Sequence, residues 1–292
     1  MIRATRAGLI DRVGDQQRTN SARLRRWEEV ATTGLAINRP SDAPERLYEA
    51  HNMSKSAANQ AQWGSNAGDA ASHLQAMDQA LTTGHDIIVR ARELAVQMAG
   101  ETVGAAERAA AAVEVRELQQ SMLATANITF NDRYLFAGWE YDQPAFDSTF
   151  VYQGDANEPE ARVGESRYIR VGLDGSQVFQ GTVDIFGTLE NLAVALETND
   201  QPTTFAQLDD LSAAVAQLST WQGVVGSEQA AAEDAVAVTE SMKVLFSDRL
   251  SDLIEADPVV AYMELGEAQN AYNATLRVAA STSTTSLLDL LG

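Results

Sequence analysis

Near both ends of the chain, mostly apolar residues recur at alternating spacings of three and four. This is the heptad pattern of helices that pack along a seam. The first pattern ends before Gly34, and the last begins after Asp257-Pro258, where Asp is a favoured cap and Pro a favoured first helical residue. The first seam is Ile10, Val13, Gln17, Asn20, Leu24, Trp27 and Ala31. The last is Tyr262, Leu265, Gln269, Tyr272, Leu276, Ala279, Ser283, Ser286 and Leu290. The pattern predicts a helix at each end, and the last mirrors the first.

Longer heptad patterns between these ends predict a rod of antiparallel helices. The first long pattern has the seam positions Met53, Gln60, Trp63, Ala67, Ala70, Leu74, Met77, Leu81, Ile88, Ala91, Ala95 and Met98. A shorter one follows the Gly100 to Gly104 turn, through Ala111, Val115, Leu118, Met122 and Thr125. The second long pattern runs Leu208, Leu211, Val215, Leu218, Gln222, Val225, Gln229, Ala232, Val236, Thr239, Lys243, Phe246, Leu250 and Leu253. Helices of this length suit a rod better than a globule.

Residues 134 to about 182 break the helical period. Phe150 and Tyr152 alternate with polar neighbours, as do the apolar residues at 169, 171 and 173, and glycine-containing turns separate these runs. Helical spacing returns from Ile185 to Leu196, before a predicted loop from Asn199 to Pro202. The predicted fold is therefore mainly α, a long antiparallel helical rod with terminal coiled-coil helices and a small β-rich insertion domain.

These patterns divide the chain into three parts. The terminal helices would comprise 1–36 plus 258–292, the rod 44–133 plus 203–257, and the β-rich outer insertion with its following helix 134–202. The order along the chain is helix, insertion, helix, so the insertion interrupts the rod.

Charge narrows the possible partners. The 292 residues contain 21 Lys and Arg against 41 Asp and Glu, a formal charge of −20, which excludes general binding to nucleic acid or to an acidic membrane. Residues 1–26 run against this trend, with seven Arg and two Asp, so they carry +5 and the rest of the chain −25. This basic stretch is either a solvated helix face or a segment that docks on acidic neighbours.

The sequence predicts no catalytic, cofactor-binding or metal site. Neither glycine-rich phosphate-binding pattern occurs. The three histidines, His51, His73 and His85, fall within one helical segment without a known ligand spacing, and adjacent carboxylates such as Asp209 and Asp210 point to different faces of a helix. Cysteine is absent. No apolar run is long enough to span a membrane, and the first residues lack the apolar stretch of a cleaved signal peptide.

Six short motifs are spread along the chain. They are Ile37-Asn38-Arg39-Pro40-Ser41-Asp42-Ala43-Pro44, Ala126-Asn127-Ile128-Thr129, Tyr134-Leu135-Phe136-Ala137-Gly138, Tyr152-Gln153-Gly154-Asp155, Asp257-Pro258-Val259 and Ser286-Leu287-Leu288-Asp289-Leu290-Leu291. These motifs resemble the flagellin superfamily, in the form typical of its hook-filament junction proteins, the hook-associated proteins of type 3. Filament flagellins usually lack the prolines at 40 and 44. Each motif alone is weak, but together they cover nearly the whole chain.

The resemblance implies a structural adaptor of the bacterial flagellum, exported through the flagellar type III channel without a cleaved signal peptide and assembled outside the cell at the growing tip. The implied partners are neighbouring copies of the chain, the other hook-filament junction protein, flagellin, and an export chaperone at the C-terminal helix. No cofactor, nucleic acid or membrane is implied. The family's terminal helices form an inner coiled coil, its central helices a rod, and its insertion faces outward.

We expect the terminal helices to need neighbouring subunits. Burying Ile10, Val13, Leu24 and Trp27 would contribute about 6 to 12 kcal/mol, whereas backbone entropy costs about 1 to 2 kcal/mol for each of some 30 residues. Residues 1 to about 35 and about 258 to 292 are therefore predicted to be mobile in the monomer and helical in the assembly. The predicted assembly interface is Ile10, Val13, Leu24, Trp27, Tyr262, Leu265, Tyr272, Leu276, Leu287, Leu288 and Leu290.

A junction turn is predicted at Asn38, Arg39, Pro40, Ser41, Asp42 and Pro44. Its prolines interrupt the helix, and Ser41 or Asp42 would cap the helix that starts near Pro44. The turn joins a terminal helix to the rod and would fix the angle between them.

Other interpretations remain open. A filament flagellin is the nearest, and extensive self-polymerisation would favour it. A helical sensor or adaptor unrelated to flagella could share the heptads but would normally need a ligand pocket or membrane span. An enzyme is the weakest alternative.

Overall fold

The computed structural model describes the backbone of residues 2–39, 41–100 and 102–291, and the side chains of these residues except 2–7, 9–10 and 282–291. The chain forms two compact units, one from residues 1–58 and 243–292 and the other from residues 59–242. The three-part division predicted from the sequence stays a prediction.

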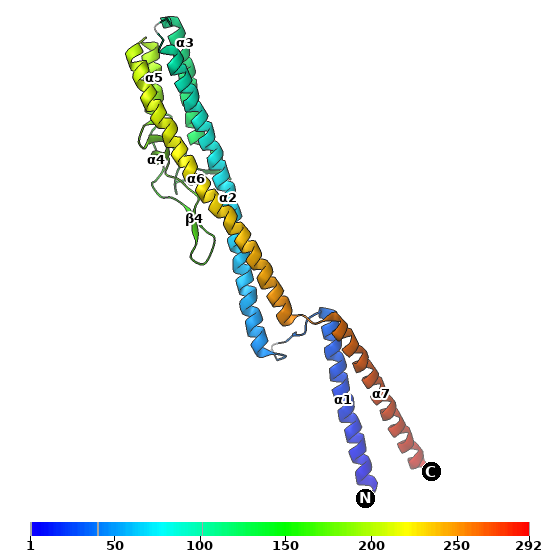
Figure 1. The fold of residues 1–292 in the computed structure, drawn as a ribbon. Helices are drawn as coiled ribbons and strands as arrows, with labels where there is room; N and C mark the ends of the chain where they lie inside the picture. The colour runs from blue at the N-terminus through cyan, green and yellow to red at the C-terminus, as the bar shows by residue number, and fades with distance from the viewer. Residues whose placement is uncertain (1, 40, 101, 292) are drawn as a thin grey trace. The chain divides into compact units, whose positions relative to one another are not determined.

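The first unit contains the two end helices. They are α1 (Ile2–Thr33) and α7 (Pro258–Leu291), which run antiparallel and side by side (Figure 1), so both predicted end helices are confirmed. Gly34 ends α1 at a φ of 73°, a backbone angle that glycine adopts at little cost. Just beyond, the N–H of Ala36 donates to the carbonyl oxygen of Ile254, and the N–H of Ala256 donates to that of Gly34. The segments that enter α2 and leave α6 are thereby held together.

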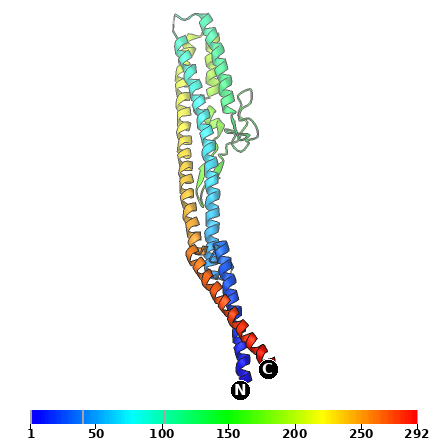
Figure 2. The same cartoon turned by 90° about the vertical axis from the view of Figure 1, so that its right-hand side faces the viewer.

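The second unit is built on long helices. It contains α3 (Ala105–Ala126), α5 (Ile185–Glu197) and the parts of α2 (Pro44–Met98) and α6 (Gln201–Ile254) that lie between residues 59 and 242. Figure 2 shows these helices running alongside one another. The predicted helices are confirmed, but the loop predicted from Asn199 to Pro202 is shorter. Pro202 lies in the first turn of α6, where its missing N–H leaves no hydrogen bond unmade.

The core of this unit follows the predicted seams, with one shift. The buried cluster extends along the chain from Ala67 to Ala235 and includes most of the seam positions predicted in α2. In α6, however, Val236 is exposed and Ala235 is buried in its place. An α-helix has 3.6 residues per turn, so a strict 3.5-residue repeat drifts away from the packed face over many turns.

The insertion holds little regular structure. Its two antiparallel hairpins are β1 (Thr129–Phe130) with β2 (Arg133–Tyr134), and β3 (Glu160–Arg162) with β4 (Tyr168–Arg170). The short helix α4 (Gly175–Gln180) lies where the sequence pattern predicted strands and turns, and the Asp174 carboxylate caps it. The mainly α fold with a small β-containing region is confirmed.

Aromatic side chains form the interior of the insertion. Phe136, Phe146, Phe179 and Phe186 are almost fully buried, and the rings of Phe146 and Phe186 lie 5.1 Å apart. Such edge and tilted pairs stabilise a core beyond the area they bury. Among the described residues, no helix is long and apolar enough to cross a membrane.

Candidate assembly surfaces

The contact between α1 and α7 is shallow. Among the side chains described in these two helices, only Val30, Ala261 and Ala268 are buried apolar groups. A polar pair lies in the middle of the seam, where the Asn20 amide donates to the carbonyl oxygen of Ala271 at 3.2 Å. This contact buries far less apolar surface than the core of the second unit, so it stabilises the helix pair weakly.

Part of the basic charge of α1 is used within the chain. The Arg23 guanidinium lies 2.7 Å from the Glu264 carboxylate and 3.6 Å from that of Glu267, both on α7. Arg25 and Arg26 are exposed and line a hollow of about 290 Å³ beside the junction turn. The basic face is therefore only partly neutralised by its own chain.

The structure places the predicted interface residues in different surroundings. Val13, Leu24, Trp27, Leu265 and Tyr272 are partly buried between the two helices. Tyr262 and Leu276 are exposed instead, because the residues in the seam are their neighbours Ala261 and Thr275. The side chains of Ile10, Leu287, Leu288 and Leu290 lie outside the described residues.

The first turns of α7 carry an exposed apolar surface. Val259 is 67% exposed, and Tyr262 and Met263 are each 64% exposed. At 100° per residue these three positions share the face of α7 opposite Ala261 and Ala268, which pack on α1. A cluster of large exposed apolar side chains is a mark of a protein interaction surface.

The junction turn is held by its own side chains. The Asp42 carboxylate accepts hydrogen bonds from the backbone N–H groups of Asn38 at 3.2 Å and Arg39 at 2.9 Å. It therefore fixes the preceding loop and does not turn towards the start of α2, where we predicted a cap. The Arg39 guanidinium lies 3.0 Å from the Glu29 carboxylate of α1. Ser41 is exposed, Pro44 is the first residue of α2, and Pro40 lies outside the described residues.

Two of the sequence motifs, 134–138 and 152–155, contact each other in the insertion. Gly138 has a φ of 67°, and a Cβ there would lie 2.6 Å from the carbonyl oxygen of Asp155. The Asp155 carboxylate accepts a hydrogen bond from the Trp139 N–H at 2.7 Å, and the Tyr152 hydroxyl lies within hydrogen-bonding distance of the Phe136 carbonyl oxygen. Burial and the nearby Asp174 raise the pKa of Tyr152, so its hydroxyl stays protonated.

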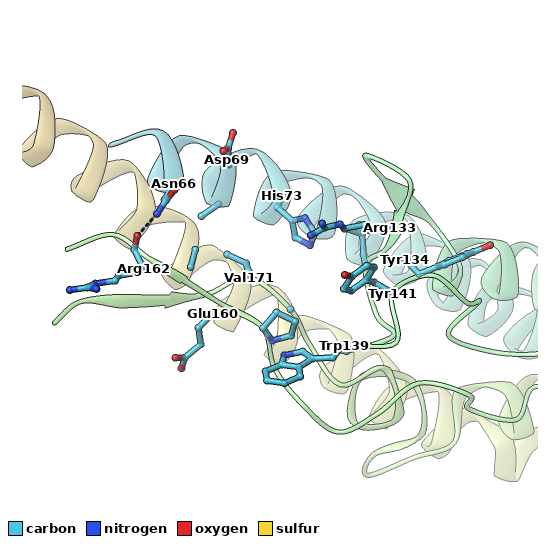
Figure 3. Close-up of a pocket in the computed structure, with 16 residues that line it drawn as sticks. Asn66, Asp69, His73, Arg133, Tyr134, Trp139, Tyr141, Glu160, Arg162 and Val171 are labelled. Atoms are coloured by element: carbon cyan, nitrogen blue, oxygen red, sulfur yellow. Dashed lines mark hydrogen bonds between the residues drawn. The ribbon is translucent and has the colours of Figure 1, made fainter. Parts of the chain in front are cut away.

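A hollow of about 780 Å³ lies between α2 and the insertion (Figure 3). His73 of α2 lines it from one side, and Arg133, Trp139 and Tyr141 line it from the insertion. The Arg133 guanidinium lies 4.5 Å from the centre of the Tyr141 ring. Burial, together with the charge of Arg133, lowers the pKa of His73 and keeps its imidazole neutral at pH 7.

The described residues contain no cluster of three or more His, Asp or Glu side chains arranged to hold a metal ion. The geometry offers contact surfaces.

The comparisons with known proteins agree with this arrangement. Residues 14–140 match the model of the bacterial flagellin N-terminal helical region. Flagellar hook-associated protein 3 of Escherichia coli is 26% identical over 269 residues, which cover 82% of this chain and 84% of that protein. The chain is thus similar to a flagellar hook-associated protein over most of its length and to flagellins over its N-terminal part. This similarity supports a structural role in the bacterial flagellum.

A filament flagellin is a more limited match to this chain. The flagellin of Clostridium tyrobutyricum is 34% identical over 120 residues, which cover 41% of this chain but only 32% of that flagellin. The crystal structure of the flagellar junction protein FlgL from Legionella pneumophila shares the fold, with a TM-score of 0.60 at 14% identity over 70% of this chain and 99% of that one.

Sequence reasoning missed two features of this protein. The packed face of α7 passes through Ala261 and Thr275, one position before the predicted Tyr262 and Leu276, and a regular heptad count does not register that step. The hollow beside Arg133 is formed by segments distant in sequence. The one local signal for it was Asn131-Asp132, which turn β1 into β2 with φ values of 51° and 60°.

Proposed function

We propose that this protein joins the hook side of the bacterial flagellum to the flagellin filament. The observation that carries the proposal is the weakly packed pair α1 and α7, which leaves Val259, Tyr262 and Met263 exposed on one face. Neighbouring subunits would cover that face. Polymerisation and the ordering of the terminal helices would then be coupled, because a single intramolecular contact offsets too little of the entropy of ordering them.

The assembly interface would extend along both terminal helices. It would include the partly buried Val13, Leu24, Trp27, Leu265 and Tyr272 together with the exposed Tyr262 and Leu276. Ile10, Leu287, Leu288 and Leu290 would continue it towards the helix ends. The junction turn would set the direction in which α1 leaves the rod, since Asp42 and Arg39 fix the loop on both sides.

The remaining parts of the proposal follow from the relationship to hook-associated proteins. The protein would leave the cell through the flagellar export channel without a cleaved signal peptide, with a chaperone on its C-terminal helix. Its partners in the flagellum would be copies of itself, the other junction protein and flagellin. Its role would be mechanical, without catalysis or a cofactor.

The experiment is to delete the gene in its host, image the cells for hooks and filaments, and assay flagellin in the medium. We expect hooks without filaments and flagellin released from the cell, both reversed by the unchanged gene. Intact filaments in the deletion strain would contradict the junction role. Loss of the main filament protein itself would identify the chain as a filament flagellin.

A further inference from the structure

The hollow between α2 and the insertion contains a guanidinium with unused hydrogen-bond donors. In Figure 3 the Arg133 guanidinium lies between the His73 and Tyr141 rings. It has no hydrogen-bond acceptor among the residues that the structure describes. Elsewhere in the same unit, Arg90, Arg116, Arg167 and Arg170 each pair with a carboxylate. The exposed Arg133 and Arg92 have no such partner among the described residues, and of these two only Arg133 lines the hollow.

The geometry suits a carboxylate. A guanidinium stacked on an aromatic face keeps the N–H groups of its edge free, and that edge matches the two oxygens of a carboxylate. His73 adds a neutral imidazole, which can donate a further hydrogen bond without adding charge. The carboxylates of Asp69 and Glu160, although they line the hollow, point away from Arg133 (Figure 3).

The net charge of the second unit bears on the source of a carboxylate that could bind Arg133. Residues 59–242 contain eight Arg, no Lys and 27 Asp or Glu, a formal charge of −19. This field repels a free small anion from solution. In an assembly held together by other contacts, a carboxylate of a neighbouring copy would meet the hollow at a high effective concentration that offsets this repulsion, and the same acidic surface supplies many such groups.

We propose that the hollow receives an exposed Asp or Glu side chain of a second copy of this chain, with Arg133 as its bidentate partner. The contact would link neighbouring copies through their insertions and would not involve the terminal helices. This inference rests on the proposed function, because only the assembled flagellum brings copies side by side. It adds a specific interaction to an assembly that otherwise depends on the apolar end helices.

The test is photo-crosslinking in assembled flagella. A benzophenone amino acid replaces Trp139, which lines the hollow and is 63% exposed, in the full chain expressed in the deletion strain. We expect a covalent dimer of this chain whose link maps to a segment bearing Asp or Glu. Arg133→Ala should reduce the dimer at least tenfold. Arg92→Ala removes the same charge from an exposed position of α2 outside the hollow, and it should leave the dimer unchanged.

A second variant separates folding from binding. Arg133→Lys keeps a cation over Tyr141 but loses the planar fork, so it should fold normally and still reduce the dimer severalfold. Crosslinks to a different protein, or equal dimer yields with and without Arg133, would overturn the inference. If filaments attach normally and no dimer forms, the inference fails while the proposed junction role stands.

Discussion

The exposed face of α7 gives the sharpest test of assembly. We consider the double variant Tyr262→Ser with Met263→Ser, which removes two large apolar side chains that are each 64% exposed in the single chain. Because both side chains already face solvent, the free energy of unfolding of the monomer should change by less than about 0.5 kcal/mol. The variant therefore separates assembly from folding.

The size of the expected effect follows from the exposed fractions. Fully burying a side chain of this size is worth roughly 1.5 to 3 kcal/mol, and about two thirds of that remains to be gained at each position. The two substitutions together should weaken assembly by about 2 to 4 kcal/mol per subunit, which corresponds to about 30- to 700-fold in affinity.

The assay measures how much protein stays on isolated hooks and how much appears in the medium, in the deletion strain expressing each variant. We expect the double variant in the medium and few filaments on the cells. Val96→Ser with Val113→Ser is the matched control, because these residues are 56% and 60% exposed on α2 and α3 of the other unit. Equal losses for both pairs, or full retention of the α7 variant, would refute the reasoning.

Three further predictions follow. Gly138→Ala should lower the free energy of unfolding, measured by thermal denaturation, by about 1 to 3 kcal/mol, because the φ of Gly138 is positive. Gly226→Ala should not lower it, because a Cβ at Gly226 would meet no other atom. Hydrogen bonds, above all from Thr149 and Asn157 respectively, hold the pKa of Asp147 and Asp155 below the ordinary value near 4. Their ionised forms stabilise the fold above that pH, so stability in a denaturant series should fall as the pH drops through the lowered pKa values, and Asp155→Asn should weaken this dependence. Hydrogen exchange should be fast in α1 and α7 of the dilute monomer and slow in the assembly, while α2 is protected in both.

The long helices could be predicted from the sequence because their signal repeats over many turns. Eleven of the twelve seam positions in the pattern from Met53 to Met98 place apolar residues on one face, and a proline stands at the start of both α2 and α7. The position of the seam is less secure than the helix. A shift of one residue turns the face by 100°, which is enough to expose Tyr262 and bring Ala261 into the contact.

The insertion could not be predicted in the same way, because its order comes from contacts between distant segments. Its strands are two or three residues long, too short to show an alternating pattern. Hydrogen bonds between residues distant in the sequence hold this region together. For example, the side-chain amide of Asn127 accepts a hydrogen bond from the N–H of Phe146 and donates one to its carbonyl oxygen. The motif residues Gly138 and Asp155 were visible in the sequence, but their mutual contact was not.

The distribution of buried residues bears on how such a protein can remain unassembled until it reaches its site. The unit from 59 to 242 has a continuous core from Ala67 to Ala235, so it has the means to fold without a partner. The described side chains of α1 and α7 bury only three apolar residues and expose larger ones on α7. Moving Val259, Tyr262 or Met263 into the intramolecular seam would stabilise the monomer but remove the surface that neighbours need. Weak packing of the terminal helices is therefore what makes their ordering depend on assembly.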